Sequence, residues 1–186
     1  MKAAPPTLPA MRQAVLHRWP SALGLAAAAF QLATGADRDS VAIVIAVATL
    51  CYLGAAALDR PWIAWAGVLG ASVVVTVCEL AGLPWWAGLG LTALALLGAG
   101  LAGGAPRPAL TAQTLALAGY GGLAMTALVV APRAGLALAG VTLAAHAAWD
   151  VVHYRRNTVV PRSLAEFCVL LDVPLGIGAI VLAVVD

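Results

Sequence analysis

Charged residues are scarce in this sequence. Of its 186 residues, 10% are charged, with 10 Lys or Arg and 8 Asp or Glu side chains. Soluble chains carry roughly 25%, so these charges are too few to cover the surface of a soluble globule. Because 63% of the residues are hydrophobic and the mean hydropathy is +0.98, the composition excludes a soluble enzyme, a disordered chain and a nucleic-acid-binding module. It indicates an integral membrane protein.

Cysteines and clustered basic residues are also lacking. The three thiols, Cys51, Cys78 and Cys168, lie inside apolar runs and form no CxxC pair, so we expect buried apolar thiols and no disulfide framework. The net charge is +2, and no block of Lys and Arg occurs, which predicts no nucleic-acid partner. The expected partners are membrane lipids and a hydrophobic small-molecule substrate, and the sequence indicates no oligomeric state.

Seven apolar runs are what the sequence contains instead. Each is close to the ~20 residues that a helix needs to cross the hydrocarbon core. No segment alternates apolar and polar residues as a barrel requires, and lipid leaves only helices for such runs. The sequence therefore predicts one all-α domain with seven transmembrane helices, at residues 20–36, 41–58, 62–82, 85–104, 109–131, 134–154 and 164–185.

The first run is the weakest, because it is short and ends at small residues that also fit a cleaved signal peptide. The basic residues favour a retained helix. If the chain crosses the membrane seven times, eight basic residues lie on one side and two, Arg38 and Arg133, lie on the other. If it crosses six times, the ten basic residues are divided five against five. This predicts a cytoplasmic N-terminus, an outside C-terminus and a place in the inner (cytoplasmic) membrane. The cytoplasmic set is Lys2, Arg12, Arg18, Arg60, Arg107, Arg155, Arg156 and Arg162.

Glycines are frequent in the fourth and fifth runs. Small residues let transmembrane helices approach closely, so we expect tight helix packing there, with a general Ala/Gly bias as the alternative. The positions are Gly98, Gly100, Gly104, Gly119, Gly121 and Gly122.

The sixth run carries three ionisable side chains on one stripe. On a helix, His146, Asp150 and His153 lie within an arc of about 60°. An ionisable group at mid-membrane costs about 2.5–3.5 kcal/mol on insertion scales, so each needs a partner or a purpose. Counted from the basic residues 155–156, His146 lies about 13 Å deep.

The seventh run offers a matching stripe. Cys168 and Asp172 are four residues apart and share a face, and Asp172 lies about 13 Å from Ser163, where the helix is expected to begin. The short link between the two runs makes them antiparallel neighbours, so the stripes face one another. Pro174 predicts a kink beside Asp172. Ser163 and Glu166 fit a capping box, so we expect Glu166 to close the helix end.

The two polar stripes contain the types of side chain that bind metal ions. Imidazole, carboxylate and thiolate groups bind Zn, Fe or Mn, and the candidate ligands are His146, Asp150 and His153, with Asp172 and Cys168 as further ones. Without a metal, His146, Asp150 and Asp172 form a catalytic acid–base network. The remaining interpretation is that His–Asp pairs only hold two helices together.

Other polar groups at this depth are expected to line a pocket open to the cytosol. Trp149, Gln113 and Tyr52 are the candidate substrate-binding residues. Glu79 lies near the outer end of the third run, as either an outer-leaflet carboxylate that reaches to the surface or a separate packing residue.

The layout, with seven spans and His146, His153 and aspartates inside them, resembles the alkaline ceramidase-like membrane hydrolases, which use a three-histidine zinc site with Ser and Asp. This sequence departs from that pattern, because two histidines lie in its spans and no serine stands beside them. The layout is also similar to small seven-span terpenoid cyclases, which use buried carboxylates as acids. Both similarities rest on architecture alone.

The sequence thus predicts a membrane-embedded enzyme, either a hydrolase or a cyclase/isomerase, that acts on a lipid or isoprenoid substrate from the cytosolic side. One alternative is a proton- or metal-ion-coupled transporter or channel, although the outer half offers few polar groups for a path. Another is a non-catalytic assembly protein, although its short loops leave little surface for partners. The polar groups of the outer half are Gln31, Thr76, Glu79 and Thr126.

Overall fold

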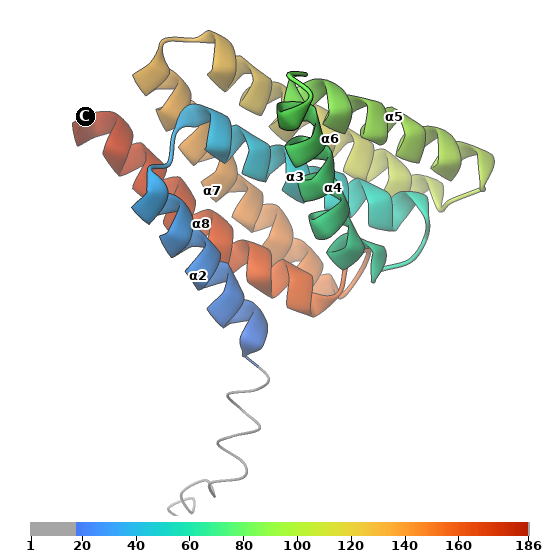
Figure 1. Ribbon diagram of the computed structural model, residues 1–186. Coiled ribbons are helices and arrows are strands. Elements are labelled where there is room, and N and C mark those ends of the chain that lie inside the picture. Colours follow the sequence, from blue (N-terminus) through green and yellow to red (C-terminus); the bar gives the residue numbers. More distant parts are fainter. Residues whose placement is uncertain (1–17, 186) are drawn as a thin grey trace, which may run out of the picture.

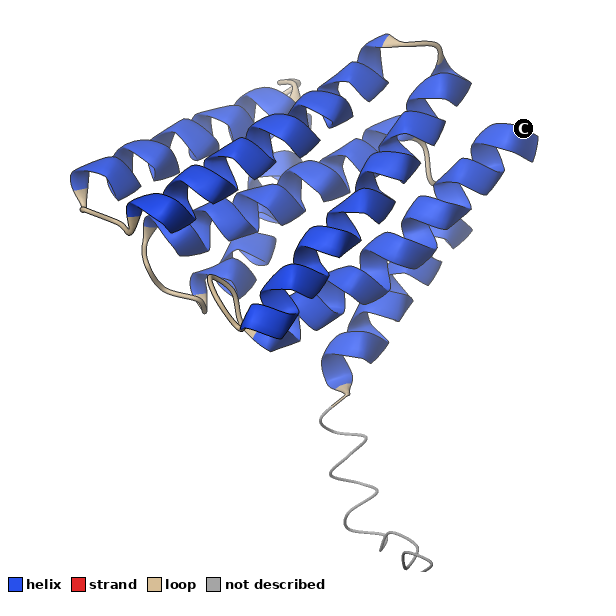
Figure 2. Cartoon of the chain, turned by 180° about the vertical axis from the view of Figure 1, so that it is seen from behind, coloured by secondary structure: helices blue, strands red, loops and turns tan. Residues whose placement is uncertain are grey.

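Seven α-helices make up the part of the chain that the computed structural model describes, residues 18–185, and no strand occurs in that range (Figures 1 and 2). Every helix begins and ends within three residues of its predicted span. Lys2 and Arg12 of the charge count lie outside the described residues. The helices are α2 (Trp19–Thr34), α3 (Arg38–Ala57), α4 (Ile63–Leu80), α5 (Trp85–Ala102), α6 (Arg107–Val129), α7 (Pro132–Arg156) and α8 (Arg162–Val185).

Six of these helices, α3 to α8, are long and apolar enough to cross a membrane, as in a polytopic membrane protein. The links between helices have only two to five residues, so successive helices run antiparallel. Local signals set several ends: Asp37 caps α3 through the backbone N–H of Ser40, and Asn157 ends α7 in the left-handed conformation. Helix α8 continues through Pro174 to Val185.

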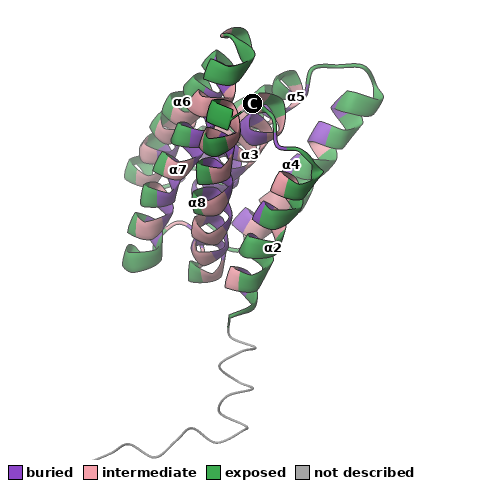
Figure 3. Ribbon diagram, turned by 90° about the vertical axis from the view of Figure 1, so that its left-hand side faces the viewer, coloured by how far each residue is buried: buried purple, intermediate pink, exposed green. Residues whose placement is uncertain are grey.

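Helix α3 is the core of the bundle. In its apolar span 72% of the residues are buried, against 17–44% in α4 to α8, because α3 packs against α4, α5, α6 and α7 at once. Figure 3 shows buried residues gathered inside the bundle and exposed residues on the outer helix faces. A side chain on α3 can therefore reach groups on several other helices.

Helix α2 lies along α8 in parallel orientation (Figure 1). Gly24 rests on the backbone at Phe167, and Leu32 packs against Gly178 farther along. At the start of both helices, Glu166 accepts a hydrogen bond from the Ser21 hydroxyl. The short first helix thus packs along α8, and its retention as a seventh span stays a prediction.

The predicted capping box at the start of α8 is wrong. Ser163 lies inside the helix, and its hydroxyl accepts a hydrogen bond from Trp65 Nε1 at 3.1 Å. Glu166 bonds Ser21 and lies 3.5 Å from Arg18 Nη1. Both side chains hold neighbouring helices rather than the end of their own.

Two glycines let the backbones of α7 and α8 come close together. A Cβ built on Gly140 lies 2.7 Å from the Gly176 carbonyl oxygen, and one built on Gly176 lies 2.7 Å from the Gly140 carbonyl oxygen. Neither position has room for a side chain. Gly176 follows Asp172 by one turn, so this contact holds the α8 carboxylate against α7.

The prediction of close helix packing at the glycines of the fourth and fifth runs is mostly wrong. Only Gly100 meets another helix closely, at Ala57 of α3. Among the described residues, a Cβ built on Gly121 meets only Leu117 of its own helix, and a Cβ built on any of the other four meets nothing within 4 Å. These glycines therefore reflect composition. Those four are Gly98, Gly104, Gly119 and Gly122.

Candidate functional site

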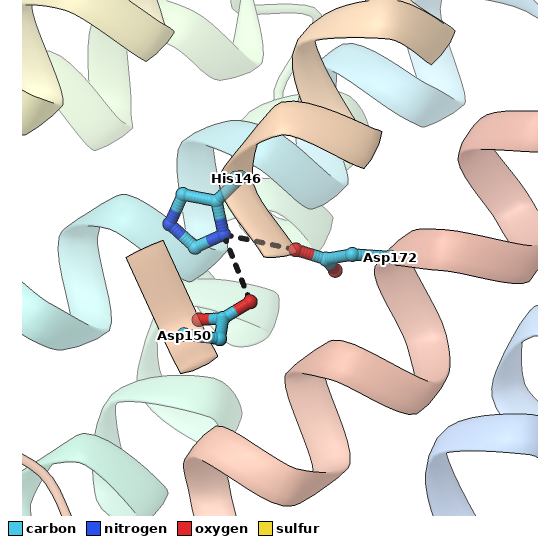
Figure 4. Close-up of side chains that lie close together, drawn as sticks. All are labelled: His146, Asp150 and Asp172. Carbon is cyan, nitrogen blue, oxygen red and sulfur yellow. Dashed lines mark hydrogen bonds and ion pairs between the residues drawn. The ribbon is translucent and has the colours of Figure 1, made fainter. Parts of the chain in front are cut away.

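The site forms where α7 and α8 face each other. His146 and Asp150 lie one turn apart on α7, and both point toward Asp172 of α8 (Figure 4). His146 Nδ1 lies 2.9 Å from Asp172 Oδ2 and 3.4 Å from Asp150 Oδ2. The prediction that His146 and Asp172 share one level and face each other is confirmed.

Helix α3 completes the site with a tyrosine. The Tyr52 hydroxyl donates a hydrogen bond of 2.6 Å to Asp150 Oδ1, and its ring lies edge-on to His146 at 5.8 Å. The Tyr120 ring of α6 also stands edge-on to His146, at 5.0 Å. Sequence reasoning missed Tyr120, because nothing in the pattern of the fifth run says which of its faces meets the sixth.

The three ionisable groups are sealed from the surface. The side chains of His146, Asp150 and Asp172 have 0% exposure. The expected opening to the cytosol is therefore not seen at these side chains. Close helix packing at Gly140 and Gly176 and the cover of α3 close the site.

Each member of the cluster keeps a buried polar atom without a hydrogen-bond partner among the described residues. These atoms are His146 Nε2, Asp150 Oδ2 and Asp172 Oδ1. Leaving a buried donor or acceptor unpaired costs about 1–3 kcal/mol, and more for a charged group. The charges do not balance either, because two carboxylates face one imidazole. The cluster is thus incomplete as a structural ion pair.

His153 belongs to a different network. Its Nδ1 donates to the Trp149 carbonyl oxygen at 2.8 Å, so its Nε2, 3.0 Å from Gln113 Nε2, accepts from that amide. The Gln113 oxygen accepts in turn from Trp149 Nε1 at 3.1 Å. Both ring nitrogens of His153 are engaged, and the structure does not bring it into the His146 cluster.

Of the three expected substrate-binding residues, only Tyr52 touches the cluster. Trp149 and Gln113 bond each other and His153 on the side of α7 that meets α6. This second network has no unpaired side-chain atom among the described buried residues. It links α6 and α7 through side-chain hydrogen bonds.

The two inner thiols lie beside the site rather than in it. Cys51 and Cys168 line an apolar cavity of about 220 Å³ between α2, α3, α4 and α8. Cys168 is outside the group of donor atoms that lie within 4.8 Å of one another, which comprises His146, Asp150 and Asp172. Glu79 is exposed near the end of α4, so it is not a packing residue.

The fold and the site together describe a helical bundle of the polytopic membrane type with a buried His/Asp/Asp cluster. Comparison of the chain with protein-family models, with curated proteins and with solved structures found no match.

Proposed function

We propose that this protein is a membrane-embedded enzyme that acts on a lipid or isoprenoid substrate, with His146, Asp150 and Asp172 as a divalent-metal centre in the inner half of the bilayer. In this proposal all seven helices cross the inner membrane, with the N-terminus in the cytoplasm and the C-terminus outside. The described basic residues support that orientation by the positive-inside rule, because six lie at one end of the bundle and two at the other.

The spacing of the donor atoms supports a metal. Ligands that stand about 2.0–2.2 Å from an ion lie about 3–3.5 Å from one another at tetrahedral or octahedral angles. His146 Nδ1 is 2.9 Å from Asp172 Oδ2 and 3.4 Å from Asp150 Oδ2. One nitrogen and two carboxylate oxygens suit Zn, Mn or Fe.

Charge balance points the same way. Two buried carboxylates and a neutral imidazole carry two negative charges, which a divalent cation neutralises. A proton on the imidazole neutralises only one of them, so the cluster without a metal needs a second proton. The convergence of three fully buried donors, whose possible ligand atoms lie within 4.8 Å of one another, is the observation that carries the proposal.

An enzyme fits better than a transporter because few polar side chains lie in the outer half of the bundle. A transport path needs polar side chains along its whole depth. In the outer half, Gln31 of α2 lines the cavity beside Cys51. Thr76, Glu79 and Thr126 lie on exposed faces of α4 and α6, and the Thr76 and Thr126 hydroxyls are bonded to carbonyls of their own helices. They do not continue the cluster outward.

Metal analysis of the purified protein tests the proposal, together with lipid extracts of the cells that produce it. We expect about one divalent ion per chain in the wild type, and loss of both the metal and the lipid change in Asp172→Asn. His153→Gln is the matched control, because it alters a buried polar group of α7 outside the cluster and is expected to keep the metal. A lipid change in cells whose protein binds no metal would replace the metal centre by acid–base chemistry of the same three residues. Unchanged lipids together with no bound metal would refute the proposal.

A further inference from the structure

Between α2 and α4 the bundle has an open apolar groove of about 590 Å³, within the usual size of a ligand site, about 300–1,000 Å³. It exists because α2 packs on α8 while α4 packs on α3 and α5. The groove walls come from α2 and α4, and α8 supplies one further residue. The lining includes Leu23, Ala27, Trp62, Trp65, Leu69 and Phe167.

A smaller cavity adjoins the groove on the side of the candidate metal centre. The cavity of about 220 Å³ beside Cys51 and Cys168 shares two lining residues with it, Val68 and Phe167. Farther in, that cavity is lined by Leu171, and Cys51 and Leu171 directly precede Tyr52 and Asp172 in the chain. The inner cavity therefore lies directly behind the wall that carries the cluster.

One end of the groove has the chemistry of a membrane surface. Trp62 is 58% exposed, and Trp19, 50% exposed, packs on Trp65 with ring centroids 5.2 Å apart. Tryptophans of this kind belong at the boundary between lipid and water. Arg18, whose side chain is 73% exposed although it pairs with Glu166, directly precedes Trp19.

A second cation lies near the same end. Arg60 is exposed two residues before Trp62, at the end of the bundle where α4 begins. Basic side chains at a membrane surface attract anionic lipid headgroups. An apolar channel with cations at its surface end fits a lipid with an anionic headgroup and a chain that lies inward.

We propose that the groove between α2 and α4 is the lateral entry for the substrate, an anionic lipid whose apolar chain passes Trp65 and Phe167 toward the cavity beside Cys51. This inference rests on the proposed function and adds to it the route and the headgroup charge of the substrate. The route ends at the cavity beside Cys51, whose neighbour in the chain, Tyr52, contacts the cluster.

Photocrosslinking tests the route without requiring turnover. The probe is a palmitate analogue with a diazirine in its chain and an alkyne at its end, added to the purified full-length protein in lipid nanodiscs. We expect adducts on α2, on α4 and near Phe167. Ala66→Trp, at an exposed groove position of α4, is expected to reduce them by about ten-fold or more, whereas Ala118→Trp, at an exposed position of α6 outside the groove, leaves them unchanged.

The headgroup and the centre are tested in the same assay. Arg60→Gln is expected to lower labelling by the carboxylate probe by about two- to five-fold, as for an exposed charge contact, and to leave labelling by the matching alcohol probe unchanged. Asp172→Asn, which loses the metal, keeps the groove adducts. Adducts spread evenly over α5 and α6, or insensitive to Ala66→Trp, would overturn the route while the metal result stands on its own.

Discussion

Replacing Tyr52 by Phe removes one hydroxyl group from the interior and leaves the shape of the side chain unchanged. That hydroxyl donates a hydrogen bond of 2.6 Å to Asp150 Oδ1, and Tyr52 is 1% exposed. A hydrogen bond to a charged group contributes about 1.5–3 kcal/mol. We expect Tyr52→Phe to lower the free energy of unfolding by that amount.

The same substitution should weaken the metal centre. A group that orients a ligand from outside the coordination sphere is worth about 10- to 100-fold in metal affinity, so we expect the dissociation constant for Zn²⁺ to rise by that factor. Competition with a chelator measures the affinity, and unfolding in mixed micelles of increasing dodecyl sulfate content measures the stability.

Tyr154→Phe is the matched control for both measurements. Tyr154 is 38% exposed near the end of α7, and its loss of a hydroxyl should change stability by less than about 0.5 kcal/mol. Wild-type affinity and stability in Tyr52→Phe would refute the role given to this hydrogen bond. Reduced stability with unchanged affinity would remove Asp150 from the ligand set.

Three further predictions follow from the packing. Gly176→Val is expected to push α8 away from α7 and abolish metal binding, whereas Gly119→Val, where a side chain meets open space, should bind metal normally; metal analysis of both variants decides this. Gln113→Leu leaves the buried Nε2 of His153 without its donor and is expected to cost about 1–3 kcal/mol of stability with the metal retained, and metal loss would contradict the separation of the two networks. Because α2 packs along α8, the protein isolated from membranes is expected to retain residues 19–34, and an intact mass that lacks them would contradict this packing.

The helices could be predicted from the sequence because a membrane span is defined by length and apolarity. Charged and proline-rich links then set the limits of each run. The facing of His146 and Asp172 was also predictable, since a five-residue link forces α7 and α8 into an antiparallel pair and fixes the level at which their polar residues meet.

Side-chain partners were not predictable, because they depend on rotations that the sequence does not give. His153 shares the stripe of His146, yet it bonds the carbonyl of Trp149 in its own helix and Gln113 of α6. Glu166 has the spacing of a capping residue, yet α2 supplies a nearer partner in Ser21. In both cases a side chain on a neighbouring helix supplies the hydrogen-bond partner that local sequence does not predict.

Close helix contacts were equally hidden. Gly140 and Gly176 pack backbone against backbone, while Gly119 and Gly122 face outward, and all four are glycines in apolar runs. The difference is the helix that each one meets, which follows from the order of the bundle and not from local sequence. The burial of His146, Asp150 and Asp172 likewise follows from which helices pack around them.

Anomalous X-ray diffraction from crystals grown with Zn²⁺ and measured above the zinc absorption edge tests the central claim most directly. A metal centre at this site predicts one strong peak within about 2.0–2.2 Å of His146 Nδ1 and of an oxygen of both Asp150 and Asp172, absent from crystals of Asp172→Asn. A map without a peak between α7 and α8, or with zinc only on exposed side chains, would contradict the account.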